Sequence, residues 1–335
     1  MIQPIKFEND VLLLIDQLKL PMQEVWVKIK TLEEGAKAIK DMIVRGAPAI
    51  GVTAAYTYAL AFKNKPFSSD YANLVKETLN STRPTAVNLF WAVSEMEKVA
   101  KFCKKNLYTT LLNHAKKIHA DDITMNKKIG ANALDLFPKK LKVLTHCNAG
   151  SLATGGYGTA LGVIYSAFSK NLIEKVWVDE TRPFLQGARL TAYELEKAGV
   201  PNTLICDNMS ASLMAKGEID LVVVGSDRIA KNGDVANKIG TYAVAVLAQY
   251  HKIPFYVAAP SSTIDFNIAC GNDIPIEERA KSELGIFNGK QIVYDLDNIY
   301  NPGFDVTPNH LVSGIITEEK VHYYPYINSL KVCDS

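Results

Sequence analysis

Hydrophobic and polar positions follow one pattern up to about residue 121 and a different one after residue 137. Two short runs of strand type come first, at 11–16 (VLLLID) and 24–29 (EVWVKI). Apolar residues then recur with helical spacing or dominate whole stretches, at 31–44, 48–62, 85–105 and 108–137. We predict a mainly helical N-terminal domain that carries a few strands and covers residues 1–121.

Short runs rich in β-branched residues alternate with helical stretches in the rest of the chain. The runs are 142–146 (KVLTH), 175–180 (KVWVDE), 203–207 (TLICD), 220–227 (DLVVVGSD) and 254–260 (PFYVAAP). Alternation of this kind is typical of a parallel sheet covered by helices. We predict an α/β protein in which residues 122–335 form a Rossmann-like domain with a parallel sheet.

Composition and charge narrow the classes of function. The 335 residues are 48% hydrophobic, which is enough for a large core, and the formal net charge is +2 with Lys and Arg scattered. A protein that binds nucleic acid or an anionic membrane would concentrate positive charge on one surface. The N-terminal apolar run VLLLI is too short for a signal peptide or a membrane span. We expect a cytoplasmic protein whose partner is a small molecule, neither nucleic acid nor membrane.

The cysteines and histidines show no ligand spacing. The five cysteines form no C-x-x-C pair and the six histidines are dispersed. A disulfide framework or a thiolate metal site therefore has little support. We predict that no metal is bound.

Polar residues follow every predicted strand of the sheet. The five ends are His146-Cys147-Asn148, Glu180-Thr181-Arg182, Asp207-Asn208, Ser226-Asp227-Arg228 and Pro260-Ser261-Ser262. Because the carboxyl ends of parallel strands meet at one edge of a sheet, we expect these residues to face one crevice. Asp, Asn and Ser at such places also cap helices, but capping does not explain the thiol of Cys147.

A glycine-rich stretch follows the first predicted strand of the sheet. Gly156, Gly158 and Gly162 have the spacing G-x-G-x-x-x-G and begin about ten residues beyond the strand. A dinucleotide-binding fingerprint needs G-x-G-x-x-G in the tight turn itself, so the pattern disfavours a dehydrogenase. Small residues here instead allow backbone amides and the start of the next helix to approach an anion such as a phosphate monoester.

Three arginines precede helical patterns that begin with proline nearby. They are Arg45 in VRGAPAIG, Arg83 in STRPTAVN and Arg182 in DETRPFLQ. Proline favours the first turn of a helix, where free amides and the helix dipole attract negative charge and a guanidinium adds bidentate hydrogen bonds. Together the arginines predict a phosphorylated ligand held by residues of both domains.

Seven longer motifs resemble those of the 5-methylthioribose-1-phosphate isomerase family. They are VRGAPAIG, LTHCNAGSLATGGYGTALGVI, DETRPFLQGARLTAYEL, GSDRIAKNGDVANKIGTY, PFYVAAPSSTID, IPIEERA and NPGFDVTPNHLVSGIITE. The superfamily also contains ribose-1,5-bisphosphate isomerases and regulatory subunits of eukaryotic initiation factor 2B. The stretch NGDVANKIGTY is most similar to the methylthioribose group, and Ser226 stands where that pattern has Ala.

The resemblance implies an aldose–ketose isomerase of methionine salvage, which converts 5-methylthioribose 1-phosphate to 5-methylthioribulose 1-phosphate. Asp227 matches the proton donor of the family, and Cys147 matches the thiol placed at the reacting carbons. The positions that match substrate-binding residues are Arg45, Gly46, Ala47, Arg83, Gln186, Asn237 and Lys238. The resemblance implies a homodimer, and it implies neither a metal nor an organic cofactor.

An aldose 1-phosphate is a difficult substrate, because its anomeric oxygen is esterified and the open-chain aldehyde is not freely available. The enzyme must deliver a proton to the ring oxygen and move hydrogen from C2 to C1. Asp227 is the candidate general acid and base, and the apolar run DLVVVG before it predicts partial desolvation. Cys147 is either a thiolate base at C2 or part of an apolar wall around a hydride shift.

Three alternatives share the predicted fold. A methyl group at C5, as in 5-deoxyribose 1-phosphate, or a second phosphate, as in ribose 1,5-bisphosphate, would change the substrate and keep the isomerase chemistry. A non-catalytic regulatory subunit of the initiation factor 2B type would bind sugar phosphates without turnover. The presence of both Cys147 and Asp227 favours an enzyme.

Overall fold

The chain divides into two compact units. The computed structural model describes residues 1–84, 86–103, 105–287 and 289–330, and Thr85 of the STRPTAVN motif lies outside them. The first unit contains Met1–Asn126 and Ala149–Gly158, and the second contains Lys127–Asn148 and Thr159–Ser335. The chain passes from the first to the second within helix α5 (Leu107–Asn132), the helix that also contains the predicted boundary after residue 121.

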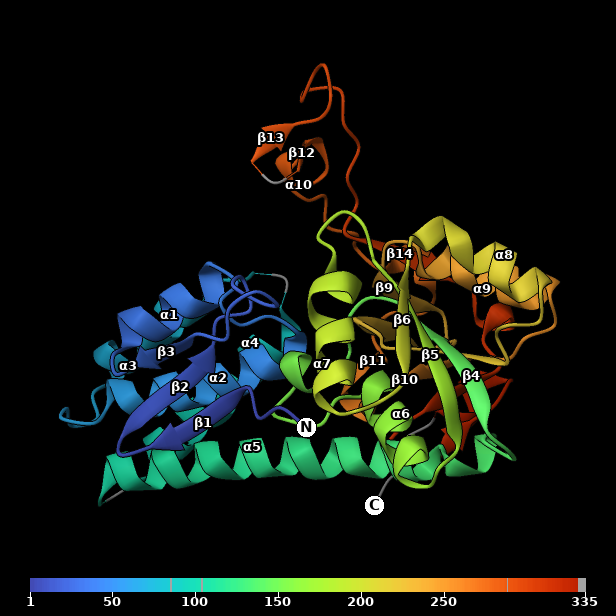
Figure 1. Cartoon of the computed structure of the whole chain (residues 1–335). Helices are drawn as coiled ribbons and strands as arrows, with labels where there is room; N and C mark the ends of the chain where they lie inside the picture. The colour runs from blue at the N-terminus through green and yellow to red at the C-terminus, as the bar shows by residue number, and fades with distance from the viewer. Residues whose placement is uncertain (85, 104, 288, 331–335) are drawn as a thin grey trace. The chain divides into compact units, whose positions relative to one another are not determined.

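The first unit packs a small antiparallel sheet against helices (Figure 1). The strands lie in the order β1 (Ile5–Glu8), β2 (Val11–Ile15) and β3 (Trp26–Ile29). The helices are α1 (Leu32–Lys40), α2 (Ala47–Ala61), α3 (Ser69–Asn80), α4 (Val87–Phe102) and the first part of α5. Because α2 is hydrophobic on all sides, it is buried along nearly its whole length and supplies a large share of this core.

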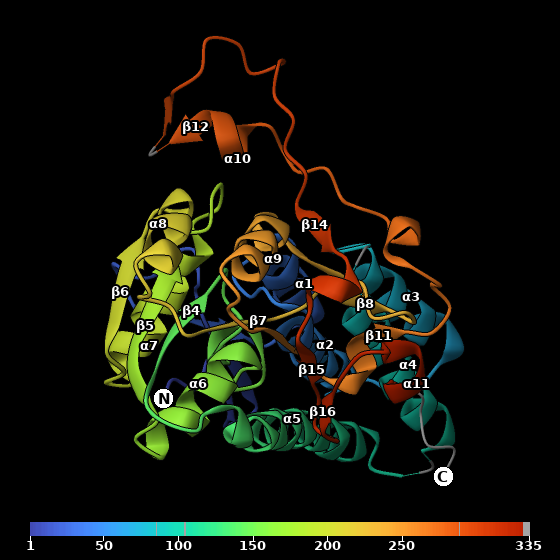
Figure 2. The same cartoon turned by 90° about the vertical axis from the view of Figure 1, so that its right-hand side faces the viewer.

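The predicted α/β fold class is confirmed by the sheet of the second unit. Its seven strands lie in the order β16-β15-β10-β7-β4-β5-β6, with β6 at one edge and β16 at the other (Figure 2). All neighbouring pairs are parallel except β15 with β16. The strands are β4 (Leu141–Thr145), β5 (Ile173–Asp179), β6 (Asn202–Ile205), β7 (Leu221–Val224), β10 (Phe255–Ala258), β15 (Gly314–Ile316) and β16 (Val321–His322). Each of the five predicted runs forms one of them.

Helices cover this sheet. They are α6 (Ala160–Ser169), α7 (Ala192–Lys197), α8 (Ser210–Ala215) and α9 (Thr241–Tyr250). On one face, Met214 of α8 and Val244 of α9 belong to the same apolar cluster as Leu144 and Val222 of the sheet. No helix in the described part of the chain has the length and apolar character needed to cross a membrane.

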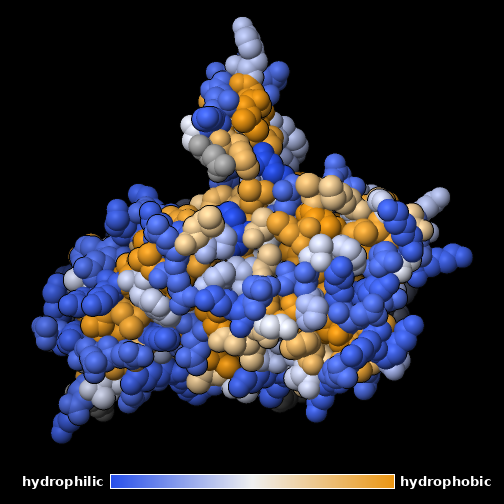
Figure 3. Space-filling view, in the orientation of Figure 1, coloured by the Kyte–Doolittle hydropathy of each residue, from blue (hydrophilic) through white to orange (hydrophobic). Residues whose placement is uncertain are grey.

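A second, four-stranded sheet has the order β11-β8-β9-β14. Its strands are β8 (Arg228–Ala230), β9 (Val235–Lys238), β11 (Ile264–Asp265) and β14 (Phe304–Thr307). Between β11 and β14 the chain forms an arm with α10 (Ser282–Gly285), β12 (Ile286–Phe287) and β13 (Lys290–Gln291), which extends away from both sheets of this unit (Figure 1). Exposed apolar side chains lie on the arm, among them Phe287, Ile292 and Tyr294 (Figure 3).

Candidate active site

Cys147 lies just beyond the end of β4, half-buried and in a strained backbone conformation. Its φ is +65°, in the left-handed region that non-glycine residues seldom occupy. Two hydrogen bonds hold it there. The Cys147 amide donates to Thr181 Oγ1 (2.8 Å), and the Thr191 hydroxyl donates to the Cys147 carbonyl (2.6 Å). The thiol is therefore presented by a backbone that the segment after β5 fixes from both sides.

The ends of β4, β5 and β6 converge, as the sequence predicted for its first three strands. Asp207 accepts hydrogen bonds from the amides of Thr181 (2.7 Å) and Arg182 (2.8 Å). His146 Nδ1 lies 3.0 Å from Asp179 Oδ2. One nitrogen or oxygen atom each of His146, Asp179 and Asp207 lies within 4.8 Å of the others. Both nitrogens of His146 face protein oxygens and both oxygens of Asp207 accept from backbone amides, whereas Asp179 Oδ1 is buried and has no partner among the described residues.

Gln186 is buried between the end of β5 and the helical turn Gly187–Thr191. Within the described residues, its Oε1 atom has no hydrogen-bond partner. A buried acceptor without a partner costs free energy, and a ligand that donates a hydrogen bond to it would remove that cost.

Asp227 and Asn237 are brought together by the small sheet. β8 and β9 pair with Arg228 opposite Ala236, and the Asp227 amide donates to the Ala236 carbonyl (3.0 Å). The expected desolvation of Asp227 is wrong, because the residue is exposed. The apolar strand before it, β7, ends at Val224, and the chain has left the buried sheet by residue 227.

Lys238 and Asn237 follow each other at the end of β9. The Asn237 side-chain Nδ2 donates to Thr241 Oγ1 (3.0 Å) at the start of α9. The Lys238 ammonium donates to the Gly303 carbonyl (2.8 Å) and lies 4.8 Å from the centre of the Phe304 ring. An ammonium has three donors, so one hydrogen bond to a carbonyl does not use its capacity to bind an anion.

Arg45, Gly46 and Ala47 lie at the start of α2 in the first unit. Arg45 Nε donates to Gln17 Oε1 (3.2 Å), and Gln17 Nε2 donates to the Leu152 carbonyl (2.7 Å). Gly46 has a φ of +91°, and a Cβ there would lie 2.4 Å from the Ala153 carbonyl oxygen. The glycine-rich loop of residues 149–158 thus packs against the N-terminus of α2, an arrangement that suits an anion.

The other two predicted arginines have different surroundings. Arg83 lies just before α4, as predicted, and is half-buried. The prediction that Arg182 lies beside a helix start is wrong, because the helical turn begins only at Gly187. The Arg182 guanidinium donates to the carbonyls of Pro183 (3.1 Å) and of Leu284 on the arm (3.1 Å).

The loop of residues 149–158 is held by two side chains of α5. His119 Nε2 lies 2.6 Å from the Gly155 carbonyl, and Asp122 Oδ2 accepts from the Gly155 amide (2.6 Å). Gly156 and Gly158 consequently belong to the first unit, whereas α6, the helix that follows them, belongs to the second. The sequence did not predict this excursion of the chain.

Asp122 should make stability depend on pH. Burial raises its pKa from 3.8 to about 6, although the Gly155 amide and Asn126 donate to it. The free energy of unfolding should therefore fall as the pH rises from about 4 to about 6, because the folded carboxyl holds its proton more tightly than the unfolded one. A gap of about two pH units corresponds to about 3 kcal/mol. Asp122→Asn removes this pH-dependent loss. Between pH 4 and pH 7 the free energy of unfolding of the variant, measured with denaturant, should therefore rise by up to about 3 kcal/mol relative to that of wild type.

Asp121→Asn is the matched control, because the Asp121 side chain is 60% exposed and pairs with Lys117 on the helix surface. It should keep the pH dependence of wild type. If Asp122→Asn also keeps it, Asp122 does not carry the buried proton.

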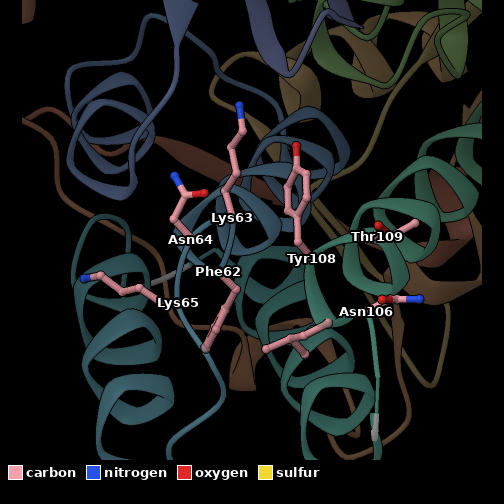
Figure 4. A pocket seen from close by; sticks show the side chains of 8 residues that line it. Phe62, Lys63, Asn64, Lys65, Asn106, Tyr108 and Thr109 are labelled. Atoms are coloured by element: carbon pink, nitrogen blue, oxygen red, sulfur yellow. The ribbon is translucent and has the colours of Figure 1, made fainter.

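Two cavities lie apart from the predicted catalytic and substrate-binding residues. One, of about 320 Å³ in the first unit, is lined by residues that include Lys63, Lys65 and Tyr108 (Figure 4). Lys63 pairs with Asp10 (3.2 Å), and Lys65 lies 4.0 Å from the centre of the Tyr71 ring. A protein carboxylate and a ring thus already occupy these cations, which does not suit a phosphate site.

The second cavity, of about 280 Å³, is lined by Ser261 and Ser262, the predicted strand end after β10. Glu318 accepts hydrogen bonds from the Ser261 amide (2.9 Å) and hydroxyl (2.5 Å). Cys147, Asp227 and the predicted substrate-binding residues do not line it. These two serines therefore serve a local structure separate from the ends of β4, β5 and β6.

Sequence reasoning assigned no specific role to two side chains that organise the site. His146 is buried and contacts both Asp179 and the Ile239 carbonyl (2.9 Å). Asp305 of β14 accepts from the amides of Gly240 (2.8 Å) and Tyr242 at the start of α9. His146 was visible as a polar residue at a strand end, whereas the role of Asp305 depends on a contact more than sixty positions away in the sequence.

Comparison with known proteins gives matches along the whole chain. Residues 43–321 match the family described as the initiation factor 2 subunit family. The chain is 53% identical, over 96% of each chain, to a protein named methylthioribose-1-phosphate isomerase from Caldicellulosiruptor saccharolyticus. It is 54% identical to a protein of the same name from Thermotoga petrophila, over 97% of this chain and 96% of the relative.

Two solved structures also match almost completely. One is 5-methylthioribose 1-phosphate isomerase from Pyrococcus horikoshii OT3, with a TM-score of 0.92, 41% identity and coverage of 98% of this chain and 95% of that one. The other is described as translation initiation factor eIF-2B, subunit delta, from A. fulgidus, with a TM-score of 0.88, 42% identity and 98% coverage of both chains. These matches confirm the predicted superfamily.

Proposed function

Because this chain belongs to the methylthioribose-1-phosphate isomerase family, we propose that it converts 5-methylthioribose 1-phosphate to 5-methylthioribulose 1-phosphate in methionine salvage. The observation that carries the proposal is 53% identity over 96% of both chains with a relative of that name. The reaction is an aldose–ketose isomerisation of a sugar phosphate. The expected homodimer and the expected cytoplasmic location stay predictions.

The proposed reaction moves three hydrogens. Asp227 protonates the ring oxygen as the bond between C1 and that oxygen breaks. The hydrogen on C2 moves to C1, and the C2 hydroxyl returns a proton to the Asp227 carboxylate as the ketone forms. Asp227 is exposed before substrate binds, so this step requires the bound sugar to exclude water from the carboxyl group.

Cys147 lies at the C2–C1 bond in this proposal. Its positive φ and the two hydrogen bonds to Thr181 and Thr191 support a thiol whose position is set before substrate binds. Pre-positioning of this kind reduces the entropy lost in the reaction. Gln186 binds a sugar hydroxyl through its unpartnered Oε1 atom.

The phosphate group is assigned to cations and helix ends. Arg45 and Arg83 precede α2 and α4, Gly46 and Ala47 supply the start of α2, and Lys238 supplies an ammonium. Asn237 binds the sugar beside Lys238. Backbone amides at a helix start together with a guanidinium are a common site for a phosphate monoester.

A second phosphate at C5 would need further cations, and the two remaining candidates already make contacts within the protein. Arg182 bonds to the carbonyls of Pro183 and Leu284, and Arg228 lies 3.7 Å from the Asp265 carboxylate. An uncharged C5 group is therefore favoured. An apolar pocket distinguishes a methylthio group from a methyl group by only about 1 to 3 kcal/mol in transition-state binding, which is roughly ten- to a hundredfold in kcat/KM.

The test is the specificity constant, kcat/KM, for the three compounds measured side by side. We expect 5-methylthioribose 1-phosphate first, 5-deoxyribose 1-phosphate within about a hundredfold, and ribose 1,5-bisphosphate well below both. Preference for the bisphosphate would refute the substrate assignment and leave the isomerase chemistry in place.

A non-catalytic subunit remains the second candidate, because the chain is 42% identical to a protein described as an initiation factor subunit. Tight binding of the sugar phosphate without any turnover would support that role and refute the enzyme.

A further inference from the structure

His146, the residue before Cys147, is buried and faces two hydrogen-bond acceptors. Its Nδ1 lies 3.0 Å from Asp179 Oδ2, and its Nε2 lies 2.9 Å from the Ile239 carbonyl oxygen. A carbonyl oxygen only accepts, so Nε2 must carry a proton. A neutral imidazole has one N–H, and an ionised carboxylate also only accepts. The two contacts are therefore both satisfied when the ring carries two protons and Asp179 carries none.

The acidic groups around the ring come from three different elements. They are Asp179 of β5, Asp207 after β6 and Asp305 of β14. Burial alone lowers the pKa of His146, but the hydrogen bond and charge of Asp179, together with the charge of Asp207, raise it overall. Burial raises the pKa of Asp179, the hydrogen bond and charge of His146 lower it, and the charges of Asp207 and Glu180 raise it again, so the balance lies somewhat above the ordinary Asp value.

The ring also connects the segments that carry the proposed site. Cys147 follows it directly, Asp179 ends the strand that leads to Gln186, and Ile239 follows Asn237 and Lys238 in the turn before α9. The fit in this turn is close. Gly240 has a φ of +102°, and a Cβ there would lie 2.9 Å from His146 Cε1.

We propose that His146 is a permanently protonated positioning residue, an imidazolium that fixes Cys147 and the Asn237–Lys238 turn relative to each other for the isomerisation. Its part in the reaction rests on the proposed function, whereas its protonation state does not. His146 does not itself touch the substrate in this proposal. It acts through the backbone of Cys147 and through the Ile239 carbonyl.

Nitrogen NMR of the histidine rings in the full-length, wild-type protein tests the charge directly. The NMR signals of the His146 ring are assigned by through-bond correlations to its own backbone, so no variant is needed for the assignment. We expect both ring nitrogens to carry protons at neutral pH and above the ordinary histidine value of about 6.5. A ring nitrogen without a proton at neutral pH would place the shared proton on Asp179 and overturn the proposal.

Three variants distinguish a positioning role of His146 from a role in stability alone. They are His146→Gln, Asp179→Asn and the double variant. His146→Gln leaves the Asp179 carboxylate buried without its partner, so its melting temperature should fall sharply. The double variant removes both charges and should recover most of that loss. We expect its kcat to stay about a hundredfold below wild type, because a misplacement of roughly 1 Å costs that much in rate.

His322→Gln is the matched control for loss of a buried histidine ring. His322 contacts the Ser329 carbonyl (2.6 Å) and Thr317 Oγ1 (3.0 Å), outside the proposed site. It should lower stability and leave kcat unchanged. A double variant with recovered stability and full turnover would show that the ring only stabilises the fold and would overturn the positioning role. If wild type itself does not isomerise the sugar phosphate, the proposed function fails, and the NMR result still decides the charge of His146.

Discussion

Asp227→Asn is expected to lower kcat by about 10² to 10⁴, while substrate binding stays within roughly tenfold of wild type. The amide keeps the shape of the side chain but cannot pass a proton to the ring oxygen. Because Asp227 is exposed, the substitution creates no new buried polar group, so the protein should still fold. Steady-state kinetics give kcat, and equilibrium binding of the sugar phosphate gives the affinity.

Asp220→Asn provides the matched control at the opposite end of β7. The Asp220 carboxylate accepts from the Lys142 amide (2.8 Å) and has no role in the proposed reaction. It should cost some stability and leave kcat near that of wild type. A loss below tenfold for Asp227→Asn would mean that proton transfer is performed elsewhere.

Cys147→Ala is expected to be nearly as damaging, with a loss of kcat of at least about a hundredfold if the thiolate is the base at C2. Cys147→Ser, which keeps a weakly acidic hydroxyl, should not restore turnover. Cys, Ser and Ala meet similar strain at a φ of +65°, so the backbone position is comparable in all three proteins. Cys103→Ser, at the end of α4, is the control and should retain full activity.

Reaction in D₂O distinguishes the two roles left open for the thiol. Removal of the C2 proton by a thiolate predicts solvent deuterium at C1 of the product. A hydride shift past an apolar wall predicts none, together with a smaller effect of Cys147→Ala. Full activity of both Cys147→Ala and Cys147→Ser would make the thiol a structural residue.

Strands were the part of the fold that the sequence predicted best. Each β-branched run between residues 142 and 260 became a strand of the large sheet, because a buried parallel strand needs a continuous apolar run and little else. Helix ends were predicted less well. α1 has a capping box at Thr31 and Glu34 but stops at Lys40, since the backbone becomes left-handed at Met42. The apolar residues of 31–44 continue past that point, so the periodicity alone extended the helix too far.

Short and polar elements escaped prediction for a related reason. α3 buries only Ala72, Val75 and Leu79, which is too narrow a stripe to stand out from the surrounding polar residues. Its N-cap, Ser68, was a local signal that could have located it. β1 is four residues long and takes its stability from pairing with β2, a contact that lies outside its own sequence.

The candidate site was likewise predicted only where local sequence determines it. Motifs around Cys147, Asp227 and Lys238 were visible in the sequence because residue type and neighbours carry the resemblance. The exposure of Asp227 and the contacts of His146 depend on which segments meet in space. Local patterning predicts the residues of such a site and not their burial.

The excursion of residues 149–158 into the first unit constrains the order in which this protein can fold during synthesis. The first unit needs this loop, because Gln17, His119 and Asp122 hydrogen-bond to it. N-terminal domains generally fold before the rest of a chain has been made. Here the ribosome must have translated α5 and β4 before the first unit has all its parts. A nascent chain that stops after residue 126 would hold an unfinished first unit, and a single cut in the gene cannot separate the two units into pieces that are each complete.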